Sequence, residues 1–133
     1  MKLRLGRIAV AAIAAEIAGV LGLVILVAIF GPSGFKAAQP FAERLGEWVG
    51  PISGLLLCIA GGYWVARGAG PYYVGNGVAM GLAGALLDLM SAVALGASFH
   101  ILLVVSNVGR VIGGYTGGFL ASRAATRAPK PQA

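Results

Sequence analysis

The chain has 133 residues, of which 59% are hydrophobic and only 11% are charged, and its mean hydropathy is +0.90. A soluble domain carries about 25% charged residues, so this composition excludes an ordinary soluble domain and predicts a protein embedded in lipid. The net charge of +6 does not predict nucleic-acid binding, because the cations lie at the ends of apolar runs rather than on a polar or aromatic face.

Four apolar runs are long enough to cross a bilayer, whose hydrocarbon core of about 30 Å requires roughly 20 residues in a helix. They span residues 8–30, 48–66, 72–95 and 99–121. The predicted fold is therefore all-α, a single polytopic membrane domain folded as a four-transmembrane-helix bundle. The first run is longer than the core of a secretory signal, about 7–15 residues, and is predicted to be a retained anchor.

Lysine and arginine are distributed unequally between the two sides of these spans. If the N-terminus is inside, the outer segments hold only Lys36 and Arg44. The inner flanks then hold Lys2, Arg4, Arg7, Arg67, Arg123, Arg127 and Lys130. Because cytoplasmic flanks are enriched in these cations, we expect both termini to be cytoplasmic, with residues 124–133 forming a disordered tail.

Residues 31–47 form the only long connection between spans, predicted to lie outside. Within and just after it, Phe41, Leu45 and Trp48 share one helical face, and Pro40 suits the first turn of a helix. This spacing predicts a short helix lying at the membrane surface. A lid over a ligand site is the alternative.

The chain contains an internal repeat. Residues 60–69 and 116–125 each read as two glycines, an aromatic residue, a large apolar residue, any residue, a small residue and arginine. Residues 18–21 and 83–86 agree more loosely. The pattern predicts a helical hairpin duplicated in tandem, with two parallel repeats related by an axis along the membrane normal.

Glycines are abundant in the spans, and small residues allow membrane helices to approach closely. Gly50 and Gly54, like Gly109 and Gly113, form GxxxG pairs. The glycines expected to pack helices together are Gly50, Gly54, Gly61, Gly62, Gly77, Gly81, Gly84, Gly109, Gly113, Gly117 and Gly118. This number exceeds what four helices need among themselves, which predicts a homo-oligomer or a larger membrane complex.

Three charges interrupt the spans: Glu16, Asp88 and Arg110. Each costs at least about 2.5–3.5 kcal/mol at the bilayer centre, and each shares a helical face with small residues, so all three should face inward. Folding the chain near residue 97 offsets Asp88 and Arg110 by about 6 Å, with side chains leaning toward each other. We expect an ion pair between them, with Asn107 beside Arg110 and Glu16 at a similar depth.

Two carboxylates and one guanidinium leave one acid in excess, so the cluster is either a structural polar core or a proton or cation site. No catalytic constellation, metal site or cofactor motif is recognised, since Cys58 and His100 are each the only residue of their type. The leading hypothesis is a non-enzymatic, self-associating or accessory membrane subunit. The alternative is a small proton-coupled transporter or channel that uses Glu16, Asp88 and Arg110.

The duplicated glycine-glycine-aromatic hairpin resembles a group of small bacterial four-span membrane proteins of uncharacterised function. The resemblance implies the bacterial inner membrane and supplies no activity. Residues 13–19 are also similar to the first helix of small multidrug resistance transporters, which carries a proton- and drug-binding glutamate. This chain departs from that family in its 22 glycines, the connection 31–47, Asp88, Arg110 and the repeat, so the glutamate's role is not carried over to Glu16.

Overall fold

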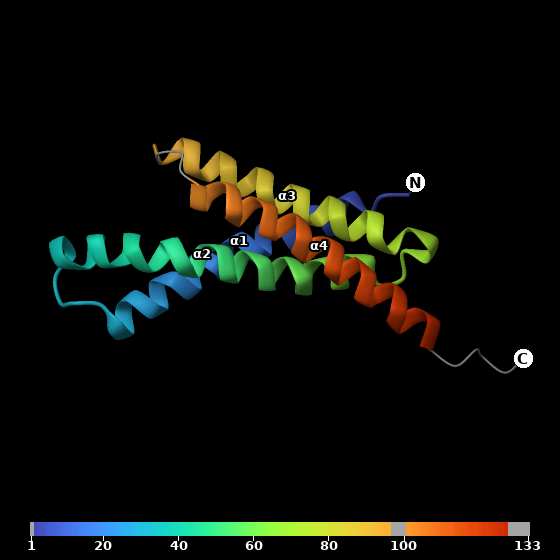
Figure 1. The fold of residues 1–133 in the computed structure, drawn as a ribbon, viewed down its shortest axis with the longest axis horizontal. Helices are drawn as coiled ribbons and strands as arrows, with labels where there is room; N and C mark the ends of the chain where they lie inside the picture. Colours follow the sequence, from blue (N-terminus) through green and yellow to red (C-terminus); the bar gives the residue numbers. More distant parts are fainter. Residues whose placement is uncertain (1, 97–100, 128–133) are drawn as a thin grey trace, which may run out of the picture.

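The protein, described here by a computed structural model of residues 2–96 and 101–127, is a bundle of four helices (Figure 1). These are α1 (Leu5–Phe30), α2 (Phe35–Ala66), α3 (Tyr73–Ala94) and α4 (Ile101–Arg127), with a short 3-10 turn, η1 (Gly70–Tyr72), before α3. The predicted all-α class is confirmed.

Three segments are long and apolar enough to cross a membrane, within the described part of the chain. They are Leu5–Phe30, Phe35–Ala66 and Gly70–Ala94. The fourth predicted span corresponds to α4, which does not reach the same hydropathy because Asn107, Arg110 and several glycines interrupt its apolar residues. Residues 97–100 and 128–133 lie outside the described residues, and with them part of the fourth predicted span and most of the predicted tail.

The helix α2 begins earlier than predicted. Only residues 31–34 separate it from α1, and the chain turns at Gly34, whose φ is 103°. Phe41, Leu45 and Trp48 are helical, as their spacing predicted, but they belong to α2, which is continuous from Phe35 to Ala66 with Pro40 and Pro51 inside it. The prediction of a long connection over residues 31–47 is therefore wrong. The 32 residues of α2 give a length of about 48 Å, well beyond a hydrocarbon core of about 30 Å.

One end of the bundle carries the N-terminus, the α2–α3 connection and the end of α4 (Figure 1). We call this the basic end, because it carries the following cations: Lys2, Arg4, Arg7, Arg67, Arg123 and Arg127. The opposite end, where α1 connects to α2, is called the open end. Towards the basic end, α4 packs on both α2 and α3, and α1 lies against α2 and α3.

Backbone contacts between glycines explain this close packing. A Cβ atom placed on Gly62 of α2 would lie 2.8 Å from the carbonyl oxygen of Gly114 in α4. One placed on Gly81 of α3 would lie 2.6 Å from the carbonyl oxygen of Arg110. Since real Cβ atoms do not approach other atoms so closely, only glycine allows α2 and α3 to meet α4 at these points. Cys58, Val65 and Met80 fill the adjoining core and are fully buried.

The N-terminus is fixed at the basic end by a fully buried side chain, Asn76 of α3. Its Oδ1 accepts a hydrogen bond from the backbone N–H of Arg4 at 2.8 Å, and its Nδ2 donates to the carbonyl oxygen of Lys2 at 3.1 Å. The guanidinium of Arg4 in turn donates to the carbonyl oxygens of Arg67 and Gly68, which follow the last turn of α2. These contacts satisfy backbone groups that a helix end leaves free.

Burial decreases sharply towards the open end. The last buried residue of α1 is Ala15 and the last of α3 is Gly84, while the first of α2 is Gly54 and the first of α4 is Ser106. Beyond these residues α3 and α4 remain side by side but lie away from α1 and α2 (Figure 1), and hollows lie between the helices. The charged cluster lies where the packed part of the bundle meets this open part.

Candidate functional site

Arg110 of α4 forms the centre of the cluster. Only 7% of its side chain is exposed, and its Nη2 lies 2.9 Å from Oδ1 of Asp88 in α3. Its Nη1 forms a second ion pair with Oε1 of Glu16 in α1. The ion pair expected between Asp88 and Arg110 is present, and Glu16 binds the same guanidinium.

A glycine of the remaining helix provides the space that Arg110 occupies. A Cβ atom on Gly54 of α2 would lie 3.2 Å from Nε and 3.3 Å from Cγ of Arg110. Gly54 was expected to pack against another helix backbone, but it accommodates the arginine side chain instead. Arg110 therefore contacts all three other helices, through Glu16, Asp88 and Gly54.

Asn107, one turn before Arg110, completes the cluster. Its Nδ2 donates to Oδ2 of Asp88 at 3.0 Å and to the carbonyl oxygen of Leu103 at 2.8 Å. Both oxygens of Asp88 are thus engaged. Two buried polar atoms, Oδ1 of Asn107 and Nε of Arg110, have no hydrogen-bond partner among the described residues.

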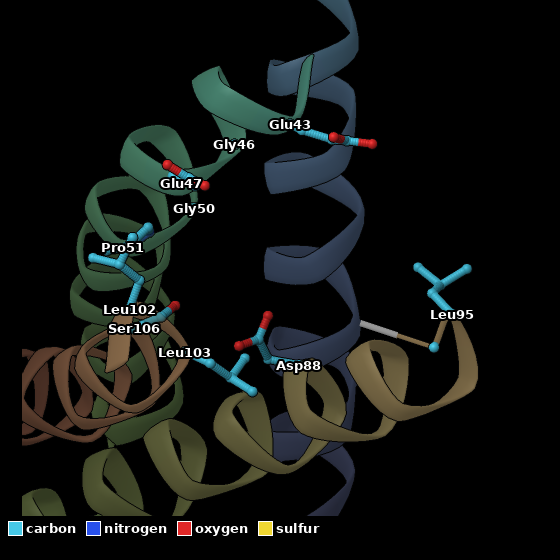
Figure 2. A pocket seen from close by; sticks show the side chains of 11 residues that line it. Glu43, Gly46, Glu47, Gly50, Pro51, Asp88, Leu95, Leu102, Leu103 and Ser106 are labelled. Atoms are coloured by element: carbon cyan, nitrogen blue, oxygen red, sulfur yellow. The ribbon is translucent and has the colours of Figure 1, made fainter. Parts of the chain in front are cut away.

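The cluster is accessible from the open end through three hollows, all of which Asp88 lines. The largest, of about 640 Å³, lies between α2, α3 and α4, and we call it the vestibule (Figure 2). A second hollow of about 180 Å³ lies between α1 and α2, and a third of about 480 Å³ between α1 and α3. Glu16 lines both smaller hollows, and the side chains of Glu16 and Asp88 are 20% and 22% exposed.

Most of the predicted packing glycines contact another helix of the same chain. Those that meet a neighbouring backbone are Gly62, Gly77, Gly81, Gly113, Gly117 and Gly118, and Gly114, which was not predicted, does the same. Those that meet side chains are Gly54, Gly61 and Gly84, which face Arg110, Met80 and Cys58 respectively. A Cβ on Gly50 would have no neighbour within 4 Å, and one on Gly109 would have only Leu55 at 4.0 Å. These glycines are therefore largely used within the chain, so their number does not by itself indicate further partners.

Among the vestibule residues not predicted as site residues, three carry an acidic or hydroxyl group: Glu43, Glu47 and Ser106. The chain has four acidic residues in total. All four line these hollows, three of them the vestibule and Glu16 the two beside it. The small number of acidic residues was visible in the composition, but their gathering in hollows was not.

No group of three or more histidine, cysteine, aspartate or glutamate side chains in residues 2–96 and 101–127 is placed to hold a metal ion. Cys58 is a buried free thiol, and His100 lies outside the described residues. Comparisons of the chain with protein-family models, curated proteins and solved structures find no match. The geometry of the cluster and the hollows therefore carries the functional argument.

Proposed function

We propose that this chain is a non-enzymatic, self-associating membrane subunit with four spans, held together by the Glu16–Arg110–Asp88 cluster. The observation that carries the proposal is the position of Arg110. One nearly buried side chain pairs with carboxylates of two helices and rests on Gly54 of a third. A nearly buried cation that is paired with carboxylates of two helices is what a structural connection between helices requires.

The energetic argument concerns helix register. A charge left unpaired at the bilayer centre costs at least about 2.5–3.5 kcal/mol. Sliding α4 by one turn would move Arg110 about 5.4 Å away from both carboxylates. Both ion pairs would then break, so the cluster favours a single register of α4 against α1 and α3.

Two features support a fourth span and cytoplasmic termini. The polar face of α4 packs inward through Ser106 and Arg110, while apolar side chains such as Val108 and Ile112 are exposed to the surroundings. The cations gather at the basic end, as expected for a cytoplasmic side.

A cysteine replacing Ser33 at the open end, in a Cys58→Ala background, should react with an impermeant thiol reagent in intact cells. Labelling only after lysis would contradict this orientation.

The repeat is part of the same proposal. Arg67 lies over the ring of Tyr63, at 5.7 Å, and Arg123 lies over the ring of Phe119, at 4.7 Å. Each arginine thus contacts the aromatic residue of its own repeat. Such a pairing of cation and ring suits the membrane surface, and a duplicated hairpin in a bacterial inner-membrane protein accounts for its occurring twice.

Self-association is supported by the third hollow, between α1 and α3. Its walls are mainly apolar, yet Glu16 and Asp88 open onto it. Lipid chains solvate carboxylates poorly, so we infer that a helix of a second copy covers this side.

Cysteine cross-linking in native membranes tests this arrangement. A cysteine replacing Ala92, which lines the hollow, should form a disulfide-linked dimer in a Cys58→Ala background. A cysteine replacing Ile112, exposed on α4, is the matched control and should cross-link far less. Equal cross-linking at both positions, or none at Ala92, would contradict self-association through this face.

A transporter or channel is the second candidate, favoured by a different observation. Glu16 and Asp88 are reached from the open end, whereas glycine-mediated contacts close the bundle beneath them. A binding group accessible from one side at a time is what alternating access requires. Transport predicts a pH-dependent flux in liposomes that Glu16→Gln abolishes, and the absence of any flux would leave the structural role.

A further inference from the structure

The vestibule is an acidic cavity in a basic protein. The chain has a net charge of +6 and only four acidic residues, yet Glu43, Glu47 and Asp88 all line this cavity. No lysine, arginine or histidine of the described residues is among its lining residues. Figure 2 shows the two glutamates on α2, with Asp88 on α3 below them in the view. A cavity of this composition attracts a cation.

Ser106 gives an independent indication of a ligand. It is 6% exposed and lines the vestibule, and its hydroxyl makes no hydrogen bond within the described part of the chain. Its oxygen is drawn turned toward the cavity in Figure 2. The buried polar atoms without a partner are Oδ1 of Asn107 and Nε of Arg110, and the Ser106 oxygen is not one of them because it is open to the cavity. A ligand in the vestibule that donates a hydrogen bond can therefore reach this oxygen.

The carboxylates are spaced along the cavity rather than gathered at one point. Gly50 lines the vestibule, and Glu47 and Glu43 precede it on α2 by about 4.5 and 10 Å along the helix axis. Within residues 2–96 and 101–127, these carboxylates do not form a group that could hold a metal ion. Spaced acids suit a ligand with spaced positive charges, and the volume of about 640 Å³ is within the range of small-molecule sites.

We propose that the vestibule binds a linear polyamine, with ammonium groups at Glu43, Glu47 and Asp88 and a hydrogen bond to Ser106. The apolar walls formed by Leu102 and Leu103 contact the methylene segments between the charges. Asp88 already accepts from Arg110 and Asn107, but a carboxylate offers about four acceptor positions, so it can accept a further ammonium proton. This site does not depend on self-association.

Calorimetric titration of spermidine into the full-length protein in zwitterionic nanodiscs tests the proposal. Saturable binding is expected, and the double variant Glu43→Gln/Glu47→Gln should weaken it at least about tenfold, since both rim charges are lost. Ser106→Ala should weaken it by about three- to fivefold. A neutral diol of similar length should not bind.

Matched variants separate the site from general charge effects. Ser91→Ala removes a serine from the neighbouring hollow and should leave spermidine affinity unchanged. Arg44→Gln changes the charge of the same helix without removing a lining carboxylate and should not weaken binding. Thermal melting checks that each variant is folded. Failure to saturate, unchanged affinity in the double glutamate variant, or displacement by an equal concentration of Mg²⁺ would overturn the proposal.

Discussion

The two ends of the bundle are built on different physical principles. Towards the basic end, glycines bring helix backbones into contact, Cys58, Val65 and Met80 fill the core, and Asn76 fixes the N-terminus. Towards the open end, α3 and α4 separate from α1 and α2, the acidic residues gather and the cavities lie (Figure 1). Tight helix packing and access to polar side chains are thus separated along the bundle axis, with Arg110 at the boundary. The packed half can therefore hold the charged side chains in fixed positions beside the cavities of the open half.

The largest effect is expected from filling space in the packed half. Gly62→Val places a branched side chain where even a Cβ would lie 2.8 Å from Gly114. Because α2 and α4 must separate, the free energy of unfolding should fall by about 3 kcal/mol, the upper end of the usual cost of overpacking, measured by thermal and denaturant unfolding in detergent. Gly22→Val is the control, since a Cβ on Gly22 meets nothing within 4 Å. Equal losses in the two variants would show that the halves do not differ in packing.

The next largest loss of stability is expected at the charged cluster, which lies between the packed half and the open half. Asp88→Asn or Arg110→Leu alone strands a partner charge, which typically costs about 3–5 kcal/mol in protein interiors. We expect the low end, about 3 kcal/mol, because water can reach the cluster from the open end.

The double variant Asp88→Asn/Arg110→Leu should recover part of the loss in thermal stability. Recovery should be incomplete, since Glu16 then loses its guanidinium partner. Adding Glu16→Gln removes the last unpaired charge and should recover more. Strictly additive losses in the Asp88–Arg110 cycle would mean that the two residues do not interact energetically.

A smaller effect is expected at the basic end from Asn76→Ala. The change removes the acceptor for the N–H of Arg4 and the donor to Lys2, and it leaves a small cavity. The unfolding free energy should fall by about 1–3 kcal/mol, with faster hydrogen exchange at the start of α1 than in wild type. Uniform exchange changes throughout the bundle would indicate that Asn76 does not act locally.

The sequence predicted the contacts that a short hairpin determines. Asp88 and Arg110 belong to consecutive helices, so counting residues from the turn predicted near residue 97 gave their relative depth. Glu16 was placed at the right depth, but its contact with Arg110 was not predicted, because no short connection fixes α1 against α4.

Other features depend on tertiary geometry that residue spacing does not contain. The vestibule depends on how far the helices separate towards the open end, and the contacts of Gly114 with Gly77 and Gly81 depend on the crossing angle of α3 and α4. The start of α2 was misplaced for a local reason. Pro40 was taken as a first-turn residue, whereas the helix-favouring residues before and after it carry the helix through the proline.

The smallest effect is expected at Gly50, and it distinguishes an open face from a covered one. Gly50 lies inside α2, where glycine destabilises a helix by roughly 0.5–1 kcal/mol relative to alanine, and a Cβ there meets nothing within 4 Å. Gly50→Ala should therefore raise the stability of the isolated chain in detergent by up to about 1 kcal/mol. If Gly50 and Gly54 instead form a GxxxG contact with a second copy, the alanine would obstruct it. In that case the alanine would still raise the stability of the isolated chain in detergent. It would change cross-linking through a cysteine at position 92 only if the Gly50–Gly54 contact borders the α1–α3 face. A fall in stability of the isolated chain would contradict the open packing around Gly50, since nothing within the described bundle meets the added methyl group.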